Sequence, residues 1–301
     1  MLAQLLRSLI LSQALVGFGI GYYLESQGMG SLAWAVVFAI GLPFLVLACS
    51  NLYSGYLSRP TGSWVMWCKA VLGEFIASTR IFLLYQPWGF RPPAFLPAQQ
   101  NKGKVPVILV HGYLCNHLIW HDVIKELQDA DHNIMPVDLE PLFTSIDDYA
   151  AILEAAVLKA CQETSSNKVI LVGHSMGGIA IRAWMRRHGA DRVAGVITLG
   201  SPHQGTKLSR GALGPNAKQM AWRSPWLKSL AASETDAVRR LFKIAITPQD
   251  NIVYPQKVQL LPGTEAQIFE GIGHLQMCLH RPVIEWLIQQ VQDIQQKETR
   301  Q

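Results

Sequence analysis

The sequence predicts an α/β domain built on a mostly parallel sheet of about six strands, with helices on both faces, preceded by a transmembrane helical hairpin. Short β-branched runs alternate with helical patterns from residue 104 onward, which is typical of a parallel sheet covered on both sides. Two long apolar stretches lie ahead of this region. We therefore divide the chain into a hairpin (residues 1–58), a connecting segment (59–103) and an α/β domain (104–301).

Composition is consistent with this division. Half of the 301 residues are hydrophobic and only 16% are charged, which is enough for one core of about 200 residues and an apolar surplus. Five cysteines without a CxxC pair argue against a disulfide framework or a zinc site and suit a reducing compartment. We expect no metal and no cofactor.

The net charge of +5 is not concentrated in any basic run, so we expect no nucleic-acid partner. The one local cluster is Arg182, Arg186 and Arg187. We interpret it as a solvated helix face, with some attraction to anionic lipid as a side effect.

Residues 2–24 carry a single charge, Arg7, and residues 32–49 carry none. Each stretch is long enough to cross the hydrocarbon core, which takes about 20 residues. A cleaved secretory signal is the alternative for the first stretch. It has one cation, no clear small-x-small cleavage site and a second apolar stretch directly behind it, so a helical hairpin fits better.

The charges flanking the hairpin indicate its orientation. Arg7 lies at its N-terminal end, Arg59 and Lys69 follow it, and the connecting loop offers Glu25 and no cation. The positive-inside rule then places both termini in the cytoplasm, with the α/β domain on the cytoplasmic side of a bacterial-type inner membrane.

Residues 63–86 repeat apolar and aromatic side chains at roughly helical spacing, but Lys69, Glu74 and Arg80 interrupt them. This pattern favours an amphipathic helix at the bilayer interface, with tryptophans at headgroup depth. A helix packed on the globular domain remains an open alternative. Residues 87–97 hold four prolines and form a stiff linker.

The α/β domain alternates strands and helices, with a long irregular segment between the fourth and fifth strands. The predicted strands are residues 105–110, 134–138, 168–172, 193–199, 243–246 and, more weakly, 267–270. The predicted helices are residues 116–130, 146–161, 179–187 and 282–296.

The pentapeptide G-x-S-x-G lies between the third strand and the third helix, with Ser175 at its centre. Such a serine occupies a strained turn that exposes its hydroxyl at the carboxyl edge of the sheet. Gly173 and Gly177 let strand and helix approach each other. The alternative is a glycine-rich turn with an idle serine.

A nucleophilic serine needs a base and an acid that orients this base. His274 follows the last predicted strand in a glycine-opened loop, and Asp250 follows the strand before it. Functional side chains collect at these strand ends. Asp236 and Glu234 compete with Asp250, but they lie in a helical-looking polar stretch; Asp250 could also be a plain turn residue.

Acyl transfer also needs two amide donors for the oxyanion. Met176, after the serine, offers one, and the turn after the first strand offers the other at Tyr113, because Gly112 brings the backbone close to the substrate. We interpret His111 and His174 as hydrogen-bonding struts of the two loops, since no metal-binding spacing accompanies them.

The motifs HGYLCN, GHSMGG, GSPHQGT and GxGH together resemble the α/β-hydrolase superfamily, and within it the bacterial lipases and related esterases. The resemblance covers about residues 105–296 and implies an α/β-hydrolase fold. It also implies that residues 207–240 form a mobile lid over the acyl pocket. A packed structural insertion is the alternative. The lid and pocket residues would be Met220, Trp222, Trp226 and Leu227.

Two departures from the secreted lipases bear on the substrate. This chain keeps an apolar front end, and no acidic cluster near His274 suggests calcium. We therefore expect a membrane-anchored serine hydrolase acting on a membrane lipid or another lipophilic ester through an acyl-enzyme. The alternatives are a thioesterase or other acyl hydrolase of a soluble substrate, and a non-catalytic scaffold. The oligomeric state cannot be predicted from these features.

Overall fold

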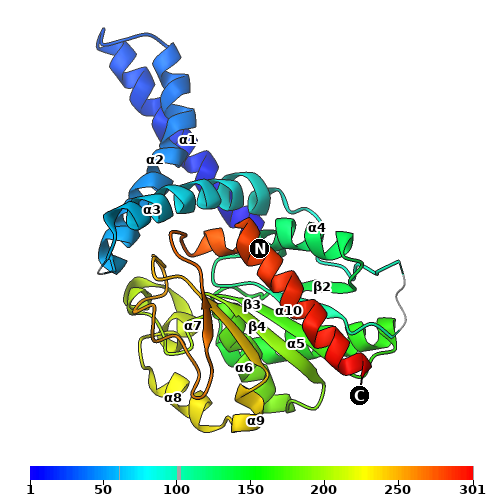
Figure 1. Ribbon diagram of the computed structural model, residues 1–301. Coiled ribbons are helices and arrows are strands. Elements are labelled where there is room, and N and C mark those ends of the chain that lie inside the picture. Colours follow the sequence, from blue (N-terminus) through cyan, green and yellow to red (C-terminus); the bar gives the residue numbers. More distant parts are fainter. Residues whose placement is uncertain (61, 100–102, 301) are drawn as a thin grey trace.

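A sheet of six strands, all parallel to their neighbours, forms the centre of the molecule (Figure 1). The computed structural model describes residues 1–60, 62–99 and 103–300. The strands are β1 (Val107–Val110), β2 (Ile134–Val137), β3 (Val169–His174), β4 (Val193–Leu199), β5 (Phe242–Ile246) and β6 (Ala266–Ile268). Their order in the sheet is β2-β1-β3-β4-β5-β6. The predicted parallel sheet of about six strands is therefore confirmed.

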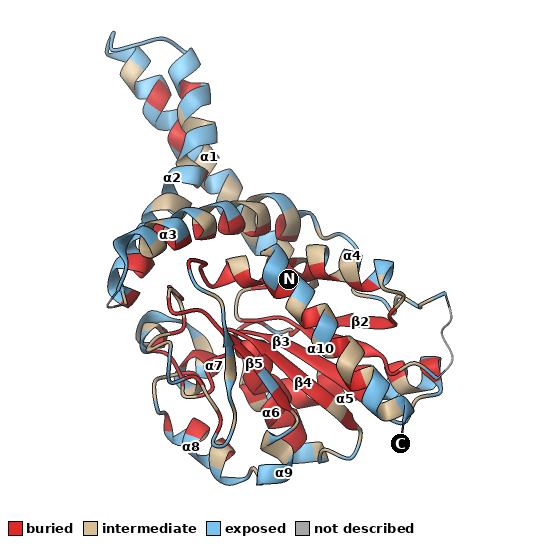
Figure 2. Cartoon of the chain, viewed as in Figure 1, coloured by how far each residue is buried: buried red, intermediate tan, exposed pale blue. Residues whose placement is uncertain are grey.

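Helices cover both faces of this sheet, because the strands are apolar on both sides. The α/β layers are completed by α4 (His121–Asp129), α5 (Tyr149–Thr164), α6 (Met176–His188) and α10 (Arg281–Thr299). Ile108 and Val110 pack with α5 and α6, whereas Val107 and Leu109 pack with α4 and α10. Figure 2 shows the sheet as the buried centre.

Two predicted helices begin with a tighter turn than expected. The helix predicted from residue 116 opens with the 3₁₀ turn η3 (His117–Trp120), and the one predicted from residue 146 opens with η4 (Ile146–Asp148). Side-chain caps explain both starts: Asn116 accepts from the Leu118 amide, and Ser145 forms a capping box with Asp148.

The N-terminal hairpin consists of α1 (Leu2–Ser26) and α2 (Ala33–Ser58), which project away from the α/β domain (Figure 1). Both helices are long and apolar enough to cross a membrane. Close packing holds them together, since a side chain at Gly17 would overlap the Phe38 carbonyl and one at Gly21 would overlap the Ala35 backbone. α2 continues nine residues past the predicted end at residue 49.

The connecting segment forms α3 (Trp64–Thr79), the π-helical turn η1 (Arg80–Tyr85) and the short turn η2 (Gln86–Trp88). α3 crosses the base of the hairpin and lies over the α/β domain (Figure 1). It buries Ala70, Glu74 and Ala77, while Val65 and Leu72 on other faces stay exposed. α3 is thus packed on the domain and still exposes an apolar surface.

Residues 207–240 form a helical cap composed of η5 (Lys207–Gly211), α7 (Gly214–Gln219), α8 (Pro225–Ala232) and α9 (Asp236–Arg239). A buried ion pair ties this cap to α6: Arg182 Nε lies 2.5 Å from Glu234 Oε1, and the guanidinium also donates to the His203 carbonyl oxygen at 3.1 Å. The interpretation of Arg182 as a solvated cation was therefore wrong, because the cap covers it.

We predict that Glu234→Ala lowers the free energy of unfolding by about 3–5 kcal/mol, since it leaves the buried Arg182 guanidinium without its carboxylate. Asp236→Ala is the matched control. Asp236 pairs with Arg239 but its side chain is 80% exposed, so its loss should cost no more than about 0.5 kcal/mol. Urea denaturation of the full chain in one detergent measures both, and equal losses would contradict the prediction.

Candidate active site

Ser175 lies in the turn between β3 and α6, with φ 53° and ψ −127°. Its amide donates to the Leu199 carbonyl oxygen at 2.9 Å, which fixes the turn against β4. The flanking glycines are sterically required: a Cβ at Gly173 would lie 2.6 Å from the Gly178 amide nitrogen, and one at Gly177 would overlap the Val110 carbonyl oxygen. The sequence thus forces the serine into a strained turn at the wall of a cavity.

The loop after β1 lies directly beside this serine. A Cβ on Gly112 would come within 2.7 Å of Ser175 Cβ, so only glycine permits this approach. His111 holds the loop, because its Nδ1 donates to the Gly112 carbonyl oxygen at 2.8 Å and its Nε2 accepts from the Leu139 amide at 2.9 Å. Burial lowers the pKa of His111, which keeps it neutral as this pattern of bonds requires.

Two backbone amides are available near Ser175. Met176 is the first residue of α6, and amides in a first helical turn have no acceptor within the helix. Tyr113 follows Gly112 and lines the cavity in front of Ser175. Its hydroxyl donates to the Leu213 carbonyl oxygen at 2.8 Å, so the loop after β1 is also tied to the cap.

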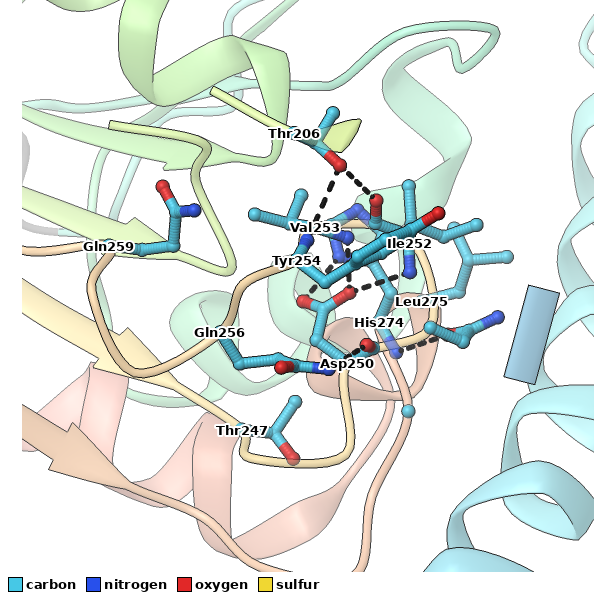
Figure 3. Close-up of polar contacts among 12 residues, drawn as sticks. Thr206, Thr247, Asp250, Ile252, Val253, Tyr254, Gln256, Gln259, His274 and Leu275 are labelled. Atoms are coloured by element: carbon cyan, nitrogen blue, oxygen red, sulfur yellow. Dashed lines mark hydrogen bonds and ion pairs between the residues drawn. The ribbon is translucent and has the colours of Figure 1, made fainter. Parts of the chain in front are cut away.

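Asp250 and His274 form a buried hydrogen-bonded pair (Figure 3). His274 Nδ1 lies 2.8 Å from Asp250 Oδ2, and both side chains are at least 96% buried. The other oxygen, Asp250 Oδ1, accepts from the amides of Ile252 at 2.9 Å and Val253 at 2.7 Å. The turn after β5 therefore directs the carboxylate towards His274 and also provides hydrogen-bond donors for its second oxygen.

The electrostatics of the pair favour a basic imidazole. Burial by itself lowers the pKa of His274, but attraction to Asp250 and their hydrogen bond raise it above its ordinary value. His174 packs against it with ring centroids 4.6 Å apart, and His174 Nε2 lies 3.2 Å from the His274 carbonyl oxygen. Burial holds the pKa of His174 well below its ordinary value, so it stays neutral.

Sequence reasoning did not single out Gly200 and Thr206 as site residues, although both lie in the GSPHQGT motif. Gly200 has φ 57°, and a Cβ there would lie 3.1 Å from His274 Nδ1 and 3.2 Å from Asp250 Oδ2. Thr206 Oγ1 donates to the Ile252 carbonyl oxygen at 2.6 Å and thereby braces the Asp250 turn. The GSPHQGT motif, which begins with Gly200 and ends with Thr206, is the sequence signal that could have identified both residues.

A mostly apolar cavity of about 310 Å³ lies in front of Ser175 and His274. Its walls come from the loop after β1, the cap and the N-terminal helices, including Ser50 of α2 and Phe82 of η1. Other lining residues are Tyr113, Leu114, Leu208, Met220, Ile252 and Val253.

Three of the four residues predicted for the acyl pocket are not among those that line it. Met220 does line the cavity, but Trp222, Trp226 and Leu227 do not. Leu227 is buried in the core beside α6, and Trp226 Nε1 donates to Asp147 Oδ2 at 2.8 Å. These side chains attach the cap to the domain. The apolar sequence pattern alone could not distinguish this role from that of a pocket wall.

No group of three or more His, Cys, Asp or Glu side chains in residues 1–60, 62–99 and 103–300 is placed to hold a metal ion. His111 and His174, which flank the two glycine-rich loops, both bond to backbone groups instead.

We predict that Gly200→Ala weakens the Asp250–His274 hydrogen bond, because its methyl group would press on both partners from a backbone conformation that disfavours alanine. The low-field proton NMR signal of His274 Nδ1–H in the full chain should shift or disappear. Gly211→Ala is the matched control, since a Cβ there meets nothing within 4 Å. An unchanged signal in Gly200→Ala would refute this packing argument.

Comparison with known proteins identifies the fold. Residues 105–243 match the family model for the α/β-hydrolase fold. The mature form of the Bacillus licheniformis lipase BlEst2 superposes with a TM-score of 0.54 at 17% identity, covering 67% of this chain and 99% of that one.

Curated relatives are enzymes that carry ester hydrolase names. The chain is 30% identical over 115 residues to a triacylglycerol lipase of Pseudarthrobacter phenanthrenivorans, a match that covers 35% of each protein. It is 24% identical over 144 residues to methylesterase 3 of Arabidopsis thaliana, covering 45% of this chain and 54% of that protein. The chain thus spans about half or less of the length of these relatives. With the sheet and the strand–serine–helix turn described above, these matches show that the chain has the α/β-hydrolase fold and is similar to lipases and esterases.

Proposed function

We propose that this protein is a membrane-anchored serine hydrolase that cleaves lipophilic carboxylic esters. The observation that carries the proposal is the buried Asp250–His274 pair, whose histidine lines the same apolar cavity as the strained Ser175. A base that is oriented by an acid and shares a cavity with a serine is the arrangement that acyl transfer needs.

In the proposed mechanism, Ser175 Oγ attacks the ester carbonyl carbon while His274 Nε2 takes up the hydroxyl proton. Asp250 holds the opposite ring nitrogen and stabilises the imidazolium. His274 then returns the proton to the departing alcohol, which leaves an acyl-enzyme on Ser175. A water molecule, activated by the same imidazole, releases the acid and restores the serine.

The developing negative charge on the carbonyl oxygen needs fixed donors. The amides of Tyr113 and Met176 are proposed for this role, because they flank Ser175 on two separate loops that the glycines bring together. His111 and His174 keep these loops in place through their backbone hydrogen bonds. Loss of one such donor commonly costs about 100-fold in rate.

The cavity supports a lipophilic substrate from the membrane. Its walls are mostly apolar, and part of them is Ser50, which lies on the proposed membrane helix α2 just beyond its most apolar part. An acyl chain in the cavity would therefore lie against the base of the hairpin. This proximity favours a membrane lipid or a comparably lipophilic ester over a soluble substrate.

The anchor is the pair of helices α1 and α2. Arg59 at the end of α2 stacks 4.8 Å above the Trp64 ring, an arrangement suited to the headgroup region. Arg7 donates to the Pro87 carbonyl oxygen at 2.9 Å, so this cation lies on the side of the α/β domain. The positive-inside rule then places the domain on the cytoplasmic side of a bacterial-type inner membrane.

A thioesterase or another acyl hydrolase of a soluble substrate is the second candidate. The same acyl-enzyme chemistry would serve a thioester, and the cavity walls do not distinguish an ester oxygen from a sulfur. A non-catalytic scaffold is a weaker candidate, since a buried carboxylate held beside an imidazole is costly to maintain without a use.

We predict that a fluorophosphonate probe labels the full chain in membranes and that Ser175→Ala abolishes the labelling. His274→Ala and Asp250→Ala should each reduce turnover of p-nitrophenyl esters by at least about 1,000-fold, because the serine loses its base or the base loses its orientation. Absence of labelling in the wild type would overturn the enzyme proposal. Normal turnover in His274→Ala or Asp250→Ala would show that a different residue acts as the base or as the acid that orients it.

Chain-length dependence separates the substrate classes. The ester proposal expects kcat/KM to rise from acetyl to longer acyl esters, because each added methylene gains apolar burial in the cavity. A preference for acetyl esters would refute the lipophilic-substrate proposal. Faster hydrolysis of acyl thioesters than of oxygen esters of equal length would favour the thioesterase.

We also predict that the full chain stays in the membrane pellet after washing with alkaline carbonate, as expected for two spanning helices. A reporter fused to the C-terminus should be active on the cytoplasmic side. Release by carbonate would contradict the anchor, and a periplasmic reporter signal would contradict the orientation.

A further inference from the structure

Glu74 is a buried acid outside the Asp250–His274 pair. It lies on α3, with a relative exposure of 1%, and its two carboxylate oxygens accept hydrogen bonds from consecutive backbone amides. Oε1 accepts from Leu275 at 3.0 Å and Oε2 accepts from Gln276 at 3.1 Å. These two residues directly follow His274. Glu74 therefore binds the backbone segment that carries the imidazole of His274.

The segment that Glu74 contacts begins a 3₁₀ turn and therefore has backbone amides available as donors. His274 is the residue before the 3₁₀ turn η6 (Leu275–Cys278), whose first amides have no acceptor within the turn. Glu74 supplies the acceptors from a helix 200 residues earlier in the chain. Gly273 permits the contact, because a Cβ there would lie 2.5 Å from Glu74 Oε2. A carboxylate at the start of a helical turn is also favourable electrostatically.

His274 is also held through Asn251, which in turn contacts α2 of the hairpin. Asn251 Oδ1 accepts from the His274 amide at 3.2 Å, and Asn251 Nδ2 donates to Ser54 Oγ of α2 at 3.0 Å. The backbone from His274 to Gln276 is thus fixed by α2 and α3 as well as by the α/β domain. In Figure 1, α3 lies across the end of the domain that carries this segment.

We propose that Glu74 is a positioning residue for His274, and that α3 is thereby a working part of the catalytic site in addition to connecting the hairpin to the domain. This inference rests on the proposed serine hydrolase function. By fixing the two amides after His274, Glu74 sets where the imidazole lies relative to Ser175. A displacement of about 1 Å at such a group can cost about 100-fold in rate.

The charge of Glu74 also acts on the imidazole. Burial raises the pKa of Glu74 to about 7; attraction to His274 and the two amides opposes this rise, and Asp250 adds to it. The nearby thiols of Cys115 and Cys278 are neutral, since burial raises their pKa values. Above about pH 7, where Glu74 is mostly ionised, its charge in turn raises the pKa of His274. Removing this negative charge should therefore lower the pKa of His274.

The test compares Glu74→Gln, Glu74→Asp and Glu270→Gln in the full chain in detergent. Glu74→Gln keeps the shape but accepts from only one amide and has no charge. It should lower kcat for a p-nitrophenyl ester about 10- to 100-fold with little change in KM. The acidic limb of its kcat/KM profile should move to lower pH, because His274 must be neutral to act as base. Glu270→Gln, an exposed change on the strand side of the same loop, should match the wild type.

The pH profile of Glu74→Asp distinguishes a positioning role of Glu74 from a purely structural one. It keeps the charge on a shorter side chain, so its pH profile should stay closer to that of the wild type and its kcat should exceed that of Glu74→Gln. It also carries the test if Glu74→Gln does not fold. A titration of His274 by NMR in the Ser175→Ala background should show the lower pKa with Glu74→Gln.

The proposal is overturned if Glu74→Gln and Glu270→Gln share the kinetics and pH profile of the wild type. It is also overturned if Glu74→Gln lowers kcat while its pH profile and the His274 titration stay unchanged, because the residue would then only stabilise the fold. Failure of the probe to label the wild type would instead remove the proposed function and this inference with it.

Discussion

The hydrogen bond between Asp250 and His274 is the constraint around which the carboxyl edge of the sheet is arranged. Burying a carboxylate is costly unless its oxygens are satisfied. Here one oxygen faces the imidazole and the other accepts two backbone amides of its own turn. The parallel sheet makes the meeting possible, because the turns after β5 and β6 open at the same edge as the serine turn after β3.

The same edge is enclosed from two directions. On one side the cap reaches it through the hydrogen bond between Tyr113 and Leu213, and Thr206, just before the cap, bonds to Ile252. On the other side α2 and α3 reach it, through Ser54 and Asn251 and through Glu74. The site is thus a junction of three parts of the chain: the α/β domain supplies Ser175, Asp250 and His274, and the other two parts supply the contacts around them.

Sequence patterns sufficed for the features that depend on local chemistry. The β-branched runs located all six strands, and the glycine spacing around Ser175 reflects a steric demand that holds wherever a strand meets a helix so closely. Asp250 and His274 could be selected because strand ends are where a parallel sheet exposes side chains. Their roles in catalysis stay predictions.

Features set by contacts between distant segments could not be read in this way. Glu74 looked like an interruption of an apolar pattern, and only the docking of α3 on η6 gives its carboxylate two amides. Arg182 looked solvated because helical periodicity does not reveal a cap that arrives 50 residues later. Trp226 and Leu227 matched a pocket wall in composition, but they contact α6 and its surroundings.

The lining of the cavity bears on where the chain can be truncated without changing the candidate site. The recognisable fold begins at residue 105, and a fragment starting there would keep the sheet and the serine turn. It would lack Ser50 and Phe82 from the cavity wall and Glu74 from behind His274. A fragment designed on fold boundaries would therefore have an open-sided pocket and a loosened histidine loop, and it would not represent the site of the whole protein.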